Sequence, residues 1–318
     1  MSKKTSIGGQ ALIEGILMRG PYKTTMAVRL PDKQIETIDL EAKSIKEKVK
    51  ILKLPILRGV VNMVESLLLG YKALMLSADK SGFTDLEEEP KKDKQNDPKK
   101  TSVLMNVVMV VGTVLGLALS LFLFMWVPSF LFDLLSSAIK TDISNLKTVF
   151  EGIIKIAVFV LYIALVSNMK DIKRVFMYHG AEHKSIFCYE AEEELTVENI
   201  RKHSRFHPRC GTSFLIVTLI VSIVVSFVLI TLFPQLKSPE LRLVWVATKI
   251  LIVPVMLGLS YELIKICGRF DNLFTRIISA PGLWLQRLTV KEPDDDMIEI
   301  AIAALNAVIP DDDSDRCC

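Results

Sequence analysis

The chain has 318 residues, of which 50% are hydrophobic and 24% are charged, and its formal net charge is +3. A mean hydropathy of +0.37 combined with so many charges means that the apolar residues are concentrated in blocks, which excludes a string of ordinary soluble domains. The small net charge gives no reason to expect nucleic acid as a partner. The first fifty residues contain no apolar core of a cleavable signal peptide.

Residues 1–50 predict a small cytoplasmic β unit. Two runs of alternating polarity, TMAVRL and QIETIDL, flank a PDK turn, and the preceding GGQALIEGILMRG contributes a further strand element. Two or three strands are not stable alone, so we expect this unit to pack on another part of the chain.

Residues 51–83 predict an amphipathic helix that lies on the membrane rather than crossing it. Charged side chains, among them Arg58 and Glu65, interrupt the apolar residues at helical intervals, and Pro55 lies near the start. Residues 84–101 (TDLEEEPKKDKQNDPKKT) are typical of a charged, disordered linker.

Four later blocks predict transmembrane helices, two within residues 102–168 and two within residues 213–265. Residues 103–127 and 213–233 carry no charge and exceed the roughly 18 to 20 residues that cross a bilayer. Residues 152–167 and 243–264 contain single charged residues close enough to an end to reach the interface. The fold class is therefore a mainly α-helical polytopic membrane protein with about four spans, a small N-terminal β unit and amphipathic cytoplasmic helices.

Lysine and arginine flank these spans unequally. They are frequent in the N-terminal region, in residues 169–212 and at the start of residues 266–318, and rare in the loops near 133–147 and 234–242. The positive-inside rule then places both termini and the 169–212 segment in the cytoplasm of a multi-pass protein. Within the C-terminal cytoplasmic segment, an acidic start followed by a helical apolar pattern predicts an amphipathic helix at about 296–309.

All four histidines of the chain fall within the predicted cytoplasmic segment 169–212. Two belong to HGAEH, in which His179 and His183 are four residues apart and share one face of a helix. Glu182 stands beside them, in the HxxEH order that inverzincin metalloproteases use with the glutamate as general base. This pattern predicts a metal site with Glu182 as the catalytic base.

Further candidate ligands follow in the same segment. His203 and His207 repeat the spacing of four, and Cys210 comes three residues after His207. Nitrogen and sulfur ligands favour zinc among the divalent cations, with iron, manganese and nickel left open. Glu262 near the inner end of the last span is a further candidate ligand. The competing interpretation is that these histidines are ordinary polar residues at the membrane interface.

Long segments of the chain resemble the YqhQ-like family of bacterial membrane proteins, which are predicted metal-dependent enzymes. The resemblance is carried by residues 8–21 (GGQALIEGILMRGP), 55–78, 178–214 (from YHGAEHKS to HPRCGTSF) and 280–305. It implies a bacterial cytoplasmic membrane protein with a metal site at His179, His183 and His207 and with Cys210 nearby. It does not extend to a ligand role for His203, and it supplies no substrate.

The sequence therefore leaves two functions open. The first is a membrane-bound, metal-dependent hydrolase that acts at the cytoplasmic membrane surface on a membrane peptide or a lipid-linked substrate, in contact with the lipid bilayer. The second is a non-catalytic scaffold or transport-associated protein with a structural zinc site whose four protein ligands leave no open position. The oligomeric state, including a homo-oligomer, also stays open.

Overall fold

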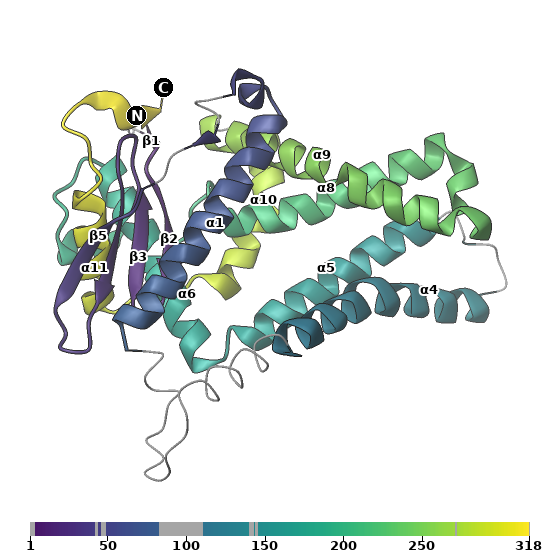
Figure 1. The fold of residues 1–318 in the computed structure, drawn as a ribbon, viewed down its shortest axis with the longest axis horizontal. Helices are drawn as coiled ribbons and strands as arrows, with labels where there is room; N and C mark the ends of the chain where they lie inside the picture. The colour runs from purple at the N-terminus through teal and green to yellow at the C-terminus, as the bar shows by residue number, and fades with distance from the viewer. Residues whose placement is uncertain are drawn as a thin grey trace, which may run out of the picture.

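The computed structural model describes residues 4–41, 44–45, 49–82, 111–139, 143, 146–270 and 272–317. The expected linker at 84–101 and the first residues of the expected span 103–127 lie outside these ranges. Figure 1 shows a body that contains the sheet, from which two helical hairpins extend to the same side.

Four strands near the N-terminus form an antiparallel sheet in which sequence neighbours pair, namely β2 (Gly8–Leu12), β3 (Gly15–Arg19), β4 (Thr24–Arg29) and β5 (Ile35–Asp39). The twofold period of a strand places Ile16 and Met18 on one face of the sheet and Leu17 on the other. Two short strands from opposite ends of the chain, β1 (Lys4–Thr5) and β6 (Arg316–Cys317), pair with each other. The expected N-terminal β unit is confirmed as a small sheet.

Helices cover both faces of the sheet. On one face, Ile16 and Met18 pack with Tyr178 of α6 (Lys170–Glu190) and Met297 of α11 (Asp295–Asn306) in one buried cluster. The short helix α7 (Val197–Lys202) joins the same cluster through its buried isoleucine. On the other face, Leu17 packs against α1 (Leu57–Lys80). The sheet obtains from these helices the apolar partners that a few strands need for stability.

Five helices in the described part of the chain are long and apolar enough to cross a membrane, by length and composition. They are α1, Val111–Ala138, α5 (Lys147–Val166), α8 (Gly211–Leu232) and α9 (Arg242–Arg269). Val111–Ala138 contains a π-helical turn, η3 (Phe122–Trp126), followed by α4 (Val127–Ala138). The count differs from the expected four because α1, whose mean hydropathy of 1.3 is the lowest of the five, also meets the criterion.

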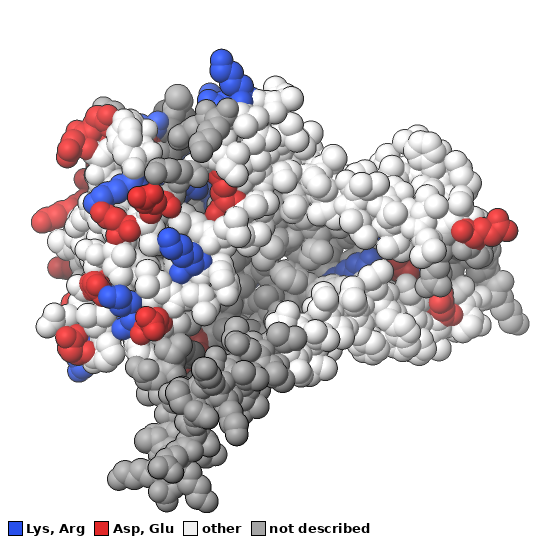
Figure 2. Space-filling view, viewed as in Figure 1, with Lys and Arg blue, Asp and Glu red and all other residues white. Residues whose placement is uncertain are grey.

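One further helix, α10 (Leu273–Thr289), packs against α8 and α9 and leads back to the body. Single 3₁₀ turns complete the described elements, namely η2 (Lys50–Lys53), η5 (Pro234–Lys237), η6 (Pro239–Leu241) and η7 (Asp313–Asp315). Figure 2 shows that acidic and basic side chains gather over the sheet-bearing body, whereas the flanks of the hairpins are mostly uncharged.

Candidate metal site

The centre of α6 carries two histidines on one face. The ring centroids of His179 and His183 are 4.4 Å apart. The two rings and Cys210 each offer one ligand atom, and these three atoms all lie within 4.8 Å of one another. Cys210 is 6% exposed and His183 is 2% exposed, whereas His179 keeps some exposure. The structure therefore brings three of the predicted ligands together at one largely buried point.

Backbone carbonyls fix the orientation of both rings. His179 Nδ1 lies 3.0 Å from the carbonyl oxygen of Thr289, and His183 Nδ1 lies 2.6 Å from that of Arg205. A carbonyl oxygen only accepts, so each Nδ1 carries the proton and each Nε2 keeps a free lone pair. Histidine ligands of metals are held in this way, with the second ring nitrogen donating to a carbonyl or carboxylate.

The sulfur of Cys210 completes the group from the start of α8. It lies 3.1 Å from His179 Nε2, and it accepts a hydrogen bond from the backbone of Thr212 at 3.4 Å as the N-cap of the helix. Zinc bound tetrahedrally at its usual distances would hold a nitrogen and a sulfur ligand roughly 3.5 Å apart, so this donor set fits a zinc ion with little adjustment.

Glu182 is buried between α6 and the sheet. Its side chain is hydrogen-bonded by the backbone of Gly9 in β2, while its Oε2 has no hydrogen-bond partner among the described residues. Burial raises the pKa of Glu182 to about 7, and the charge of His179 and the Gly9 hydrogen bond offset part of this shift. Glu182 therefore directly precedes His183 in the sequence and interacts electrostatically with His179. Its Oε2 is available to accept a proton.

The approach of β2 to Glu182 requires a glycine. A Cβ atom at Gly9 would lie 2.7 Å from the carbonyl oxygen of Leu17 and 3.0 Å from the Glu182 carboxyl carbon. The same atom at Gly8 would meet nothing within 4 Å. The double glycine of GGQALIEG thus contributes to the site at its second position only.

His207 lies beside the three-ligand group. Its ring centroid is 5.4 Å from that of His183, and its Nδ1 accepts the backbone N–H of Arg209 at 3.3 Å. Burial, the nearby His183 and the Arg209 cation hold the pKa of His207 well below its usual value, so the ring is neutral. His207 is close enough to be a fourth ligand only if this ring turns.

Gln286 of α10 holds the backbone of His207 from both sides. Its Oε1 accepts the His207 N–H at 2.8 Å, and its Nε2 donates to the His207 carbonyl at 2.7 Å and to Ser213 at 3.0 Å. Neither Gln286 nor Thr289 belongs to a motif that predicts a role at this site. The available signal was a glutamine on the apolar face of an amphipathic helix, where a buried amide needs a partner.

Two of the predicted candidates lie elsewhere. The Glu262 carboxylate forms an ion pair with Arg58 of α1 at 2.5 Å and does not join the histidine group. His203 contacts Glu193 at 3.2 Å, away from His183. The equal spacing of His203 and His207 does not place them on one helical face, because α7 ends at Lys202 and the residues before Pro208 are extended or in bends.

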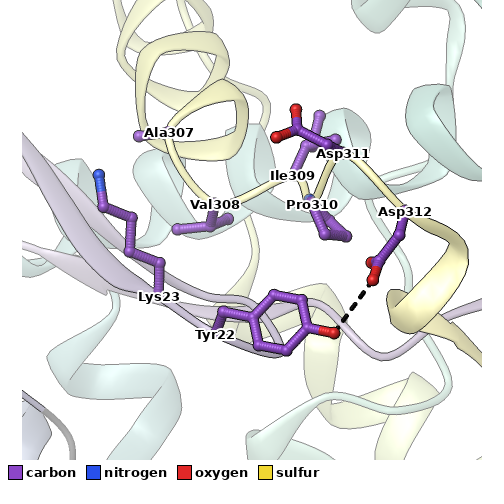
Figure 3. A pocket seen from close by; sticks show the side chains of 8 residues that line it. All are labelled: Tyr22, Lys23, Ala307, Val308, Ile309, Pro310, Asp311 and Asp312. Carbon is purple, nitrogen blue, oxygen red and sulfur yellow. Dashed lines mark hydrogen bonds between the residues drawn. The ribbon is translucent and has the colours of Figure 1, made fainter.

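A cavity of about 350 Å³ lies between the turn after β3 and the chain that follows α11 (Figure 3). Tyr22 reaches across it to donate a hydrogen bond to Asp312 at 3.1 Å. No candidate ligand lines this cavity. It is therefore not part of the histidine site.

Comparison with known proteins finds a family match that covers most of the chain. The chain is 34% identical over 303 residues to the uncharacterized protein YqhQ of Bacillus subtilis (strain 168). The aligned region covers 95% of this chain and 92% of that protein. No solved structure matches the chain. The family model described as "Protein of unknown function (DUF1385)" matches residues 54–311. The resemblance seen in the sequence is thereby confirmed, and the chain belongs to the DUF1385 family.

Proposed function

We propose that this protein is a membrane-bound, metal-dependent hydrolase whose site is built by His179, His183 and Cys210, with Glu182 as the general base. One observation carries the proposal. Two histidines, each fixed by a backbone carbonyl through Nδ1, and Cys210 offer ligand atoms that all lie within 4.8 Å of one another, and the adjacent residue Glu182 is buried with one oxygen that has no hydrogen-bond partner among the described residues. Interface histidines without a shared ligand have no reason to be oriented in this way.

A divalent cation, with zinc favoured, supplies Lewis acidity at such a site and lowers the pKa of water from 15.7 toward about 7. The protein residues supply the rest. His179, His183 and Cys210 bind the cation, and Glu182 Oε2 accepts the proton of the water that attacks an ester, amide or phosphoester. A carboxylate whose pKa is near neutrality is suited to that transfer, because a general base works best near the operating pH.

Three protein ligands support catalysis rather than a closed structural site. Catalytic zinc keeps one position for water, whereas structural zinc has four protein ligands. The fourth candidate, His207, has its Nδ1 engaged by a backbone N–H and its Nε2 3.5 Å from the Arg209 guanidinium. The alternative function, a scaffold or transport-associated protein with a structural zinc site, requires that His207 leave both neighbours and bind the cation.

The arrangement of the body supports four membrane crossings. The N-terminal strand β1 pairs with the C-terminal strand β6, and α6 packs on the same sheet as α11, so these segments share one side of the bilayer. A chain that leaves the sheet-bearing body on one side of the bilayer and returns to it crosses the membrane an even number of times. The crossing pairs are then Val111–Ala138 with α5 and α8 with α9, while α1 packs on the sheet and against α9 and lies along the membrane surface.

This topology places the site at the membrane boundary. Cys210 caps the first turn of α8, a crossing helix, and Thr289 ends α10 at the return from α9. The lysine and arginine distribution assigns that boundary to the cytoplasmic face. A membrane peptide or a lipid-linked molecule is the substrate class that reaches such a position.

Cobalt substitution tests the proposal. Full-length protein in mild detergent, loaded with Co²⁺, should show a thiolate-to-cobalt charge-transfer band that Cys210→Ser removes. Addition of a small exogenous ligand such as azide should change the cobalt spectrum of the wild type, because one position is open. The spectrum of His207→Ala should match that of the wild type.

Two results would overturn this function. A cobalt spectrum that does not respond to azide and that changes in His207→Ala would identify a closed site with His207 as a ligand. Full metal occupancy in the double variant His179→Ala, His183→Ala would remove these histidines from the site altogether.

A further inference from the structure

A second group of potential ligands lies where α6 ends. Cys188 Sγ, a carboxylate oxygen of Glu193 and a ring nitrogen of His203 all lie within 4.8 Å of one another. None of the three belongs to the group around His179. Cys188 is fully buried, and the His203 and Glu193 side chains are 19% and 45% exposed, so the group opens to solvent on one side.

Local structure holds these residues in place from three directions. Cys188 occupies the last turn of α6, and the backbone N–H of Glu193 donates to the Cys188 carbonyl at 3.2 Å. His203 is the C-cap of α7, where its backbone N–H bonds the Ile200 carbonyl at 3.1 Å. The chain reversal between the two helices therefore brings a thiol, a carboxylate and an imidazole together.

The competing explanation is an ordinary ion pair between His203 and Glu193, at 3.2 Å, with a buried cysteine nearby. That explanation accounts for the ion pair but not for a sulfur that lies within 4.8 Å of both of its members. In the described part of the chain, Cys188 Sγ donates weakly to the backbone carbonyls of Glu194 at 3.6 Å and Glu193 at 4.0 Å. A sulfur that faces both an imidazole and a carboxylate is instead positioned as a zinc ligand.

We propose that Cys188, Glu193 and His203 form a second divalent-cation site, separate from the site at His179, His183 and Cys210. Its donor set of one sulfur, one nitrogen and one oxygen suits zinc, with water in the fourth position.

The second site has a route for the cation. Glu193 also lines a cavity of about 250 Å³ whose other walls are formed by the two paired terminal strands and by Tyr189. Solvent access and the exposed carboxylate favour rapid exchange, so this site should load and release zinc faster than the buried first site.

The two sites share their supporting elements. Cys188 lies on the same helix as His183, and His203 begins the segment that continues to His207 and Cys210. A cation at the second site would join α6 to His203 at the start of the 203–210 segment. A cation at the first site would join α6 to Cys210 at the end of that segment. The second site therefore limits the movement of the segment that carries ligands of the first.

Metal stoichiometry tests this inference. Full-length protein in mild detergent, dialysed against ZnCl₂ and analysed by mass spectrometry of the metal, should hold two zinc ions per chain. His203→Ala, at a partly exposed position, should hold one, and Cys188→Ser should also hold one. Cys267→Ser, which removes another buried free cysteine, should keep both and is the matched control.

The two proposals fail separately. Two zinc ions in His203→Ala, or one zinc per wild-type chain that His203→Ala does not remove, overturns the second site. The double variant His179→Ala, His183→Ala should retain one zinc that His203→Ala then removes. Two zinc ions in that double variant would instead contradict the proposed function and leave the loss in His203→Ala as the test of the second site.

Discussion

The Glu182 carboxylate is buried, but not all of its hydrogen-bonding capacity is satisfied, because Oε2 lacks a hydrogen-bond partner among the described residues. A buried polar atom left unpaired costs about 1–3 kcal/mol. A protein that keeps such a residue next to two oriented histidines gains nothing in stability from it. Under the proposed function this cost is explained, because a carboxylate that accepts a proton in the reaction must keep one oxygen unpaired.

Glu182→Gln separates catalysis from structure. The amide keeps the shape and a hydrogen-bond acceptor for Gly9 but cannot accept a proton at neutral pH. We expect zinc content and expression at wild-type levels, with activity lower by about 10² to 10⁴-fold, measured as rescue of a deletion strain or, once a substrate is known, as turnover. Full rescue by Glu182→Gln with unchanged zinc would favour the structural site.

Gly9→Ala tests the close approach of β2 to Glu182. The added methyl group would lie 2.7 Å from a backbone oxygen, which cannot move away cheaply. We expect a loss of about 1–3 kcal/mol in the free energy of unfolding, the usual cost of overpacking. Gly8→Ala, where nothing lies within 4 Å, is the matched control and should be nearly neutral. Equal thermal stability of the two variants in detergent would refute the packing argument.

Gln286→Ala tests the support of the 203–210 segment. Truncation leaves the buried N–H and C=O of His207 without their amide partner, at a cost of about 1–3 kcal/mol. Zinc affinity at the first site should also fall, by about 10 to 100-fold, as it does when outer residues of metal sites are removed. The neighbouring exposed Arg287→Ala should change neither quantity, as measured by chelator competition.

The residues of the site differ in how far sequence could predict them. His179 and His183 share a helical face at a fixed spacing, so their proximity follows from local geometry. Cys210, Thr289 and the Arg205 carbonyl reach them from 22 to 110 residues away, through tertiary packing that no local pattern encodes. The ion pair of Glu262 could not be predicted for the same reason, because its partner Arg58 lies 204 residues away.

Among the helices, α1 is the one for which length and composition do not decide between a membrane span and a helix packed on the sheet. It meets the hydropathy criterion for a span, yet Leu69 and Ala73 pack on the sheet, while Leu67, Leu68 and Tyr71 are exposed. A helix with one face on a sheet cannot be surrounded by lipid. The exposed apolar face is the part available to the bilayer, and the interfacial position that the helical spacing of its charges indicates stays a prediction.

Reporter fusions test this assignment of elements. With Val111–Ala138, α5, α8 and α9 as the crossing helices, fusions in the connection between Ala138 and Lys147 should report the outside. Fusions at residue 90, at residue 190 and at the C-terminus should report the cytoplasm, because the odd number of crossings that includes α1 would separate the paired strands β1 and β6. An outside signal at residue 190 would contradict the position of both metal sites.

On the scale of the whole molecule, the mainly helical class with a small β-sheet followed from composition. The number of apolar helices, the end of Val111–Ala138 eleven residues beyond the expected 127, and the pairing of the two ends of the chain did not. Apolar blocks of sufficient length predict helices wherever they occur. The pairing of β1 with β6 rests on contacts such as Thr5 with Asp315, in which the hydroxyl donates to the carboxylate at 2.6 Å across 310 residues. Two-residue strands have no sequence signal of their own, so only the assembled body reveals them.

This closure has a consequence for the order of biosynthesis. Strand β1 is synthesised before all the helices that pack on the sheet, whereas its partner β6 is synthesised after them, so the two strands can pair only once the intervening residues have been made. The carbonyl of Thr289 that orients His179 is also synthesised 110 residues after that histidine. During translation the two histidines of α6 are therefore made before the groups that orient them, and the proposed metal site can form only after Thr289 has been made.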